Sequence, residues 1–239
     1  MSSFRTGAIS MTNLSINSRS RAKPSPFAPT ALISCGALGP SIHEIVERRG
    51  WAVEVHLMAA LLHNRPKLIA PQVEQLALKL QERGQTVAIA YADCGTYGAL
   101  DEVCERLGVG RLHGQHCYDV FAGPAQIQGL FAEEPGTYLL TDFLVQSFRR
   151  TVISELGLDR YPELWGEYFA HYRRVVWLAQ RRNEKLEAEV RSVADMFGLP
   201  LVIIDVGTVS LELELEAMVN AAGIATHGSL LKSESEQRA

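Results

Sequence analysis

Short apolar runs alternate with amphipathic segments along the first half of this chain, and this alternation restricts the fold more than any other feature. Apolar runs at 30–36, 51–58 and 86–95 are bounded by turn residues, which is typical of buried strands. The segments 39–50 and 70–84 carry Pro near their start and Gly at their end, as helices commonly do. The order strand, helix, strand, helix predicts an α/β fold, a Rossmann-like parallel sheet with helices on both faces.

The second half of the chain contains a long block in which helical patterns dominate. From 144 to about 198 the sequence predicts helices almost throughout, as an insertion or cap on the domain, and the run 199–207 predicts a buried strand. We therefore expect one α/β domain over 29–225, with the helical insertion near 144–198 and a frayed tail over 226–239. Residues 1–28, rich in Ser, Asn, Arg and Pro, predict a disordered extension, with a targeting peptide as the alternative.

Composition argues against several classes of protein. With 47% hydrophobic and 21% charged residues among 239, the chain has the balance of a globular protein with a sizeable core. A formal net charge of −4 argues against a nucleic-acid-binding protein, which normally carries a basic surplus. No apolar run reaches the roughly 18–20 residues that span a bilayer, so we expect no membrane segment. The 4 dispersed cysteines are too few for a disulfide-stapled secreted module, so we expect reduced thiols and a cytoplasmic location.

Two of the predicted strands end in a Cys-Gly pair. Cys35 and Gly36 follow the first apolar run, and Cys94 and Gly95 follow the third. Parallel α/β sheets bind ligands beyond the carboxyl ends of their strands, and Gly there lets a cofactor or metal approach the backbone. With Cys117 as a third thiol, three loops could supply thiolates to zinc with an open fourth position, or to an iron–sulfur cluster. Cysteines that only fill the core are the alternative.

Polar residues near these positions are candidates for proton transfer or ligand contact. His116 and Asp119 flank Cys117 and could transfer protons or supply a fourth metal ligand. Asp205 lies in the last predicted strand and could contact a bound cofactor, and a simple cap on the next helix is the alternative. Cys104 lies on the apolar stripe of its own helical segment, so we expect it in the core.

Four segments of the sequence resemble one known family. They are LISCGAL, YADCGTYGALDEV, HCYDVFAG and GTYLLTDF, and taken in order they resemble domain-of-unknown-function family 1638, a family of bacterial and archaeal proteins. The resemblance covers roughly residues 30–220 and is strongest over 86–145. It implies that Cys35, Cys94 and Cys117 occupy motif positions, with a His in place of an acidic residue before the last of them. It also implies a link to corrinoid methyltransferase systems, which members of the family accompany, but it brings no activity.

Together these features predict a cytosolic metal-binding protein, and more specifically an enzyme. A zinc ion or an iron–sulfur cluster on the three cysteines would activate a small-molecule substrate in one-carbon, methyl-transfer or lyase-type chemistry, as in a metal-dependent transferase or lyase. Without a metal, one thiolate near His116 could act as a nucleophile. The alternative is a non-catalytic accessory protein of a corrinoid protein or a methyltransferase. We expect neither nucleic acid nor a membrane as a partner.

Overall fold

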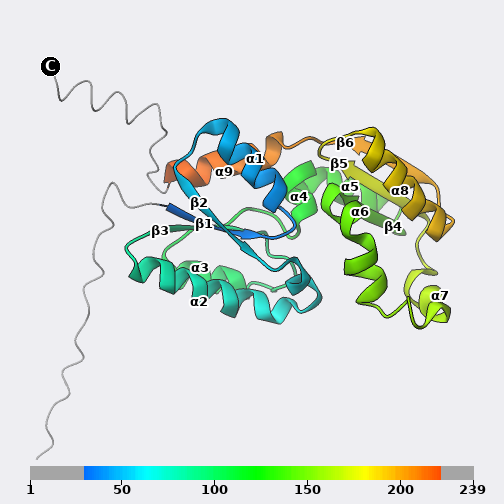
Figure 1. Ribbon diagram of the computed structural model, residues 1–239, viewed down its shortest axis with the longest axis horizontal. Helices are drawn as coiled ribbons and strands as arrows, with labels where there is room; N and C mark the ends of the chain where they lie inside the picture. Colours follow the sequence, from blue (N-terminus) through cyan, green and yellow to red (C-terminus); the bar gives the residue numbers. More distant parts are fainter. Residues whose placement is uncertain (1–29, 222–239) are drawn as a thin grey trace, which may run out of the picture.

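The computed structural model describes residues 30–221, and two parallel three-stranded sheets form its framework (Figure 1). The first sheet has the order β2-β1-β3 and consists of β1 (Thr30–Cys35), β2 (Val53–Met58) and β3 (Thr86–Ala90). β1 is buried along its whole length because it pairs with a strand on each side. The predictions made for 1–28 and 226–239 lie outside the described residues.

Helices cover both faces of the first sheet. α1 (Gly39–Arg49) and α9 (Val209–Ala221) lie on one face, and α2 (Ile69–Glu82) and α3 (Ala99–Leu107) lie on the other (Figure 1). The buried side chains of α2 recur every three or four residues, so one stripe of the helix faces the sheet. Short 3₁₀ segments η1 (Ala60–Asn64) and η2 (Pro66–Leu68) connect β2 to α2.

The second sheet has the order β4-β5-β6. Its strands are β4 (Thr137–Thr141), β5 (Arg174–Ala179) and β6 (Leu201–Asp205). The helices of this half are α4 (Cys117–Ala122), α5 (Pro124–Glu133), α6 (Asp142–Phe148), α7 (Trp165–Phe169) and α8 (Glu184–Phe197). A π-helical turn, η3 (Arg149–Ser154), continues α6, and a 3₁₀ turn, η4 (Pro162–Leu164), precedes α7.

β5 forms the centre of the second half because both of its faces are buried. Val175 and Trp177 pack with the buried side chains of α6 and α8, while Val176 and Leu178 pack with Ile127 of α5 on the opposite face. This alternation follows from the two-residue period of a strand. The structure is therefore an α/β fold of the Rossmann-like kind, built from two short parallel sheets in place of one longer sheet.

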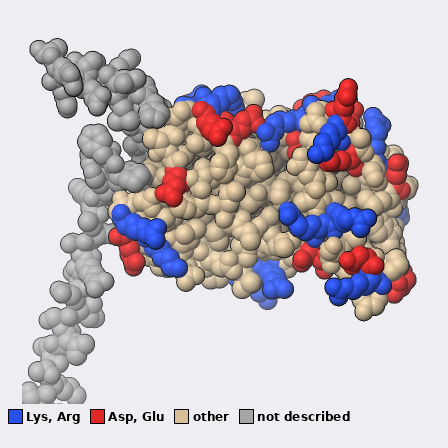
Figure 2. All heavy atoms as spheres, viewed as in Figure 1, with Lys and Arg blue, Asp and Glu red and all other residues tan. Residues whose placement is uncertain are grey.

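The end of the described chain returns to the first sheet. Leu211, Leu215 and Val219 of α9 are buried in the same core as β1 and β3. Salt bridges from Arg48 and Arg49 of α1 to Glu212 and Glu216 of α9 hold these two helices together at the surface. On the face shown in Figure 2, side chains of both charges are interspersed. Within residues 30–221 no helix is both long and apolar enough to cross a membrane.

The α/β class and the parallel strands were predicted correctly. The prediction that 144–198 is helical almost throughout was wrong in part. This block contains β5, whose residues 175–179 are all buried. Periodicity alone does not separate so short an apolar run from a buried helical turn, and the aromatic helix before it favoured the helical interpretation. The run 199–207 does contain a strand, yet β6 is an edge strand in which Leu201, Ile203 and Ile204 are partly buried and the other two residues are exposed.

Candidate functional site: a thiol cluster at one sheet edge

The carboxyl edge of the first sheet carries the cysteines that the sequence singled out. Cys35 is the last residue of β1 and is fully buried, and Cys94 lies four residues beyond β3 with 7% of its surface exposed. Cys117 is the first residue of α4 and is partly buried. Because β1 and β3 are parallel neighbours, their carboxyl ends meet at the same edge.

The three thiols lie close enough to influence one another. Burial raises the pKa of the Cys117 thiol well above its ordinary value, and negative charge on Cys94 and Cys35 raises it further. All of the chain's cysteines are free thiols. Cys104 lies apart from the other three, in the core beneath α3 with Val103 and Leu107, as the sequence predicted.

His63, which no sequence motif marks, also lies at this edge. It lies in η1, directly after the carboxyl end of β2. Its Nδ1 donates a hydrogen bond to the carbonyl oxygen of Ala60 at 2.7 Å, which turns Nε2 toward the Cys35 sulfur at 3.6 Å. We call Cys35, Cys94, Cys117 and His63 the thiol cluster.

Burial and two neighbouring sulfurs set the pKa of His63. Burial alone would lower the pKa of the imidazole, because desolvation disfavours its charged form. Hydrogen bonding to Cys35 and Cys94 and the negative charge of their sulfurs outweigh burial and raise the pKa of His63 to about 11. The sulfurs of Cys35 and Cys94 therefore favour the protonated form of the imidazole.

Tyr91 forms one wall of the thiol cluster. Its side chain is fully buried, and its ring stacks on that of His63 with the centroids 6.2 Å apart. Burial raises the pKa of the Tyr91 hydroxyl, and charge on Cys35 and Cys94 raises it further. Among the described residues the hydroxyl has no hydrogen-bond partner. A buried polar group without a partner is costly, so this hydroxyl marks a place where a polar group of a ligand would be accommodated.

The backbone at Cys94 is held in an unusual conformation. Its φ of 51° lies in the left-handed region, which disfavours side chains other than Gly. Two hydrogen bonds hold it there, from Cys94 N to Gln115 O at 2.7 Å and from Asp93 N to Gly114 O at 3.2 Å. The loop that carries Cys94 is thereby attached to the loop that leads into Cys117.

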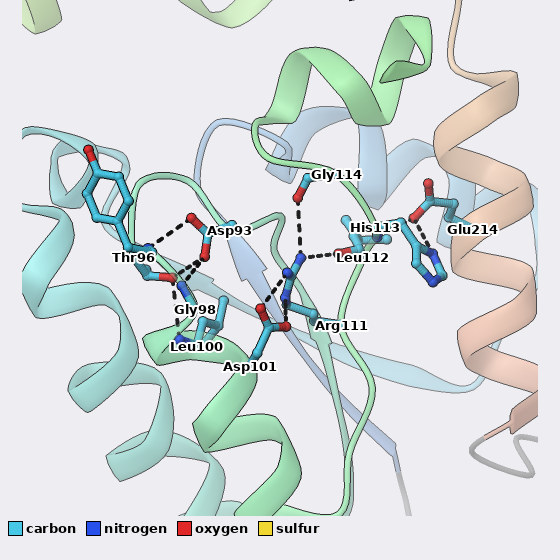
Figure 3. Close-up of polar contacts among 11 residues, drawn as sticks. Asp93, Thr96, Gly98, Leu100, Asp101, Arg111, Leu112, His113, Gly114 and Glu214 are labelled. Atoms are coloured by element: carbon cyan, nitrogen blue, oxygen red, sulfur yellow. Dashed lines mark hydrogen bonds and ion pairs between the residues drawn. The ribbon is translucent and has the colours of Figure 1, made fainter. Parts of the chain in front are cut away.

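Two charged side chains fix these loops, as Figure 3 shows. The Asp93 carboxylate accepts hydrogen bonds from the Thr96 hydroxyl at 2.6 Å and from the backbone N–H groups of Tyr97 and Gly98. Burial acts to raise the pKa of Asp93, but these hydrogen bonds outweigh it and lower the pKa. Asp93 therefore stays ionised and holds the turn that follows Cys94.

Arg111 fixes the second loop. Its guanidinium pairs with Asp101 through two nitrogens at 2.5 and 2.9 Å and donates to the carbonyl oxygens of Leu112 and Gly114 (Figure 3). Since Gly114 O also accepts from the backbone of Asp93, Arg111 links the two loops through one carbonyl group. The positions of Cys94 and Cys117 are thus set by hydrogen bonding outside the cluster itself.

The two candidate cofactor glycines lie where the backbone is crowded or strained. A side chain at Gly36 would collide with the carbonyl oxygen of Met58 and the nitrogen of Ala60, so β1 ends in close contact with the segment that leads to His63. Gly95 has a φ of 81° and lies beside Pro66. Both glycines shape the edge that carries the thiols.

The proposed proton-transfer residues lie beside the cluster. The Asp119 carboxylate accepts hydrogen bonds from the backbone N–H groups of Gln115 and His116, at 2.7 and 3.0 Å, and so organises the start of α4. His116 and Asp119 line an open cavity of about 650 Å³, together with Arg111 and Phe131. Their part in proton transfer stays a prediction.

Asp205 is placed elsewhere. It ends β6 on the edge strand of the second sheet and pairs with Arg182 at 3.2 Å.

The thiol cluster has the donor chemistry of a zinc or iron–sulfur site but not its geometry. Three thiols and one imidazole match the ligand types that such sites use. Within residues 30–221, however, no group of three or more His, Cys, Asp or Glu side chains is arranged so that it could hold a metal ion.

Fold and site together define an α/β protein with a thiol-rich edge on one of two parallel sheets. A family described as "Protein of unknown function (DUF1638)" matches residues 57–214, which is more than half of the chain. The protein belongs to this family, and its resemblance to the family is confirmed. No curated protein and no solved structure matches the chain.

Proposed function

We propose that this protein is a cytosolic metal-dependent enzyme that acts on a small-molecule substrate, with Cys35, Cys94 and Cys117 as the ligands of zinc or of an iron–sulfur cluster. The proposal rests on one observation: three thiols from separate loops share a sheet edge with His63, whose Nε2 is 3.6 Å from the Cys35 sulfur. When bound, such a group supplies an open coordination position that polarises a substrate for methyl-transfer or lyase-type chemistry. The ligand side chains would have to rearrange to bind it.

The chain's own residues would provide charge balance and orientation. His63 holds a proton beside the Cys35 and Cys94 sulfurs and so places a positive charge against them. The unpartnered Tyr91 hydroxyl could donate a hydrogen bond to a substrate atom at this edge. His116 and Asp119, at the mouth of the neighbouring cavity, are the candidates for proton exchange with solvent.

A second candidate function uses the same residues without a metal. The Cys35–His63 contact resembles the thiolate–imidazolium pairs of enzymes with a cysteine nucleophile. In this case Cys35 would attack an electrophilic carbon of the substrate, and His63 would return the proton to the leaving group. His63 then takes the place that the sequence suggested for His116. A non-catalytic accessory protein of a methyltransferase or a corrinoid protein remains the third candidate.

The first experiment is to measure metal and acid-labile sulfide after anaerobic purification of the full chain. Wild type is compared with Cys94→Ser and with Cys104→Ser, a buried cysteine outside the thiol cluster. We expect about one zinc per chain, or iron with sulfide, in wild type and Cys104→Ser, and a loss of metal in Cys94→Ser.

A folded wild type without metal would reject the metal proposal, and alkylation would then separate the other two. Rapid alkylation of Cys35 by iodoacetamide, slowed about tenfold or more in His63→Gln, supports the thiolate nucleophile. Slow alkylation that is equal in both proteins, together with co-purification of a methyltransferase or corrinoid protein, supports the accessory protein.

A further inference from the structure

A second cavity, of about 630 Å³, has an unusual combination of linings. It is formed by the turn after His63 on one side and by β4, η3 and α7 on the other. Its lining includes four aromatic rings and two side chains of opposite charge: Tyr138, Tyr168, Phe169, Tyr172, Arg65 and Glu155. A site for a purely polar ligand would not need the aromatic rings, and an apolar core would not contain the two charged side chains.

The two charged groups of this cavity are not paired with each other. Arg65 is exposed and makes no side-chain hydrogen bond or salt bridge with another described residue. Glu155 accepts one hydrogen bond, from the Asn64 amide at 3.2 Å, and forms no salt bridge within residues 30–221. Among the described residues, the cavity therefore offers one guanidinium without a side-chain partner and one carboxylate that accepts a single hydrogen bond. A ligand that satisfies both must carry an anionic group and a cationic group.

The aromatic rings add a preference for an organic cation. Tyr138 and Tyr172 meet edge to face with their centroids 4.9 Å apart, and Tyr168 at the rim is 46% exposed. The π faces of such rings attract ammonium groups, and most strongly those whose hydration is weak. The guanidinium of Arg65 fits the two oxygens of a carboxylate.

We propose that this cavity binds a small amino acid, with its ammonium nitrogen free or methylated, held between the aromatic rings with Glu155 on one side and Arg65 on the other. The ammonium group lies against the rings and Glu155. The carboxylate pairs with Arg65.

The cavity adjoins the thiol cluster, which suggests that its ligand is the substrate. Asn64, which lines the cavity, directly follows His63 in η1. Tyr118 connects the two sites. Burial raises the pKa of its hydroxyl, and Cys117 and Cys94 of the thiol cluster and Tyr138 and Tyr172 of the cavity raise it further, so Tyr118 lies near both sites. The role of the ligand as substrate rests on the proposed function, whereas its binding does not.

Isothermal titration calorimetry of the full chain tests the proposal. The probes are glycine, its trimethylated form glycine betaine, and two half-ligands, acetate and tetramethylammonium. We expect at least one of the two zwitterions to bind about tenfold or more tighter than either half-ligand. Tighter binding of glycine betaine than of glycine identifies the methylated ligand, and the reverse order identifies the free amino acid. Both results support the proposal.

Two variants and a matched control assign the binding to the cavity. Arg65→Gln and Glu155→Gln should each weaken binding of the zwitterion about tenfold or more, because each removes one charge partner. Arg83→Gln, at an exposed arginine on the end of α2, should bind as wild type does. Equal binding by wild type and Arg65→Gln, or binding of neither zwitterion, overturns the proposal.

A third variant separates this proposal from the metal site. Cys94→Ser should lose the metal but keep its affinity for the zwitterion within about threefold, because Cys94 does not line the cavity. Zwitterion binding in a wild type that holds no metal would reject the metal site and leave the cavity proposal in place. A wild type that holds metal but binds neither zwitterion would do the opposite.

Discussion

The two sheets of this protein have the same size and the same parallel pairing, but their carboxyl edges differ in chemistry. At the second sheet, Asp142 accepts hydrogen bonds from the indole of Trp177 and from the backbone nitrogens of Gln180 and Arg181, at 2.8 to 3.0 Å. The Gln180 side chain accepts in return from the nitrogen of Asp142. Every described polar group around this carboxylate has a partner, so the edge is closed.

The carboxyl edge of the first sheet, by comparison, has a buried polar group without a hydrogen-bond partner among the described residues. Its sulfurs face one imidazole, and the Tyr91 hydroxyl among them has no partner within the described chain. At the second sheet, Thr141 caps α6 and Asp142 holds the edge together through hydrogen bonds. A buried edge that leaves polar groups unused is the better candidate for a binding site. Position at a strand end is therefore not sufficient to indicate a binding site, and unused hydrogen-bonding capacity is the better indication.

We expect the largest loss of stability from a substitution of Asp142 at the carboxyl edge of the second sheet. Asp142→Ala leaves the indole N–H of Trp177 and two backbone N–H groups without their acceptor in a buried place. We expect the free energy of unfolding to fall by about 3 kcal/mol or more, measured by urea denaturation. Asp159→Ala, at an exposed aspartate, should change it by less than about 0.5 kcal/mol. Equal midpoints for the two variants would show that the hydrogen bonds of Asp142 contribute little.

A smaller effect should follow when the thiol edge is crowded. Gly36→Ala forces the end of β1 away from Met58 and Ala60, which lie next to the turn that carries His63. We expect a loss of about 1–3 kcal/mol in the free energy of unfolding, together with altered alkylation of Cys35. Gly129→Ala is the control, since its site in α5 is open and Ala favours a helix, so it should gain up to about 1 kcal/mol. A stable Gly36→Ala variant with normal alkylation would mean that the two segments separate easily.

The next prediction concerns the Tyr91 hydroxyl, which has no hydrogen-bond partner within the described chain. Tyr91→Phe deletes a buried group without a partner, so stability should stay the same or rise by about 1 kcal/mol. Tyr118→Phe deletes a hydroxyl that donates to the carbonyl oxygen of Leu139 at 3.5 Å, and should lose about 0.5–1 kcal/mol. Thermal unfolding of both variants measures the difference. A loss for Tyr91→Phe as large as for Tyr118→Phe would indicate that the Tyr91 hydroxyl already has a partner.

The smallest effect concerns pH and the pair that fixes the second thiol loop. The hydrogen bond from Arg111 lowers the pKa of Asp101, so the pair contributes stability above the unfolded pKa of about 4 and loses it as pH falls through the lower folded pKa. Asp101 is half exposed, and after solvent screening we expect less than about 1 kcal/mol. Wild type should therefore melt slightly above Asp101→Asn at pH 7, and the gap should narrow as the pH falls below about 4. A gap that is unchanged at pH 3 would rule out the charge as its cause.

Local patterns in the sequence predicted the elements well and the assembly less well. The strands 30–35 and 86–90 are recognisable as short apolar runs between turn residues. The cysteines at or just beyond their ends indicated the sheet edge at which the candidate site lies. Whether six strands form one sheet or two depends on pairing between distant segments, which no local pattern encodes. β5 was missed because its five apolar residues are too few to show a period.

The missing member of the site was His63. It occupies a 3₁₀ turn, and no motif surrounds it in the sequence. One signal was present, since β2 is a parallel neighbour of β1 and whatever follows β2 must emerge at the same edge as Cys35. Residues that directly follow a strand can therefore belong to a site even where no motif marks them.

The position of α9 sets the order in which this protein completes its fold. The first sheet is made early in the chain, but Leu211, Leu215 and Val219, which cover one of its faces, come last of the described residues. During synthesis the first sheet must keep an apolar face uncovered until α9 has left the ribosome. α4, which begins at Cys117, also contacts α9. Docking of α9 therefore completes the packing around α4, and a chain cut before Val209 should leave the helix that carries Cys117 without this contact.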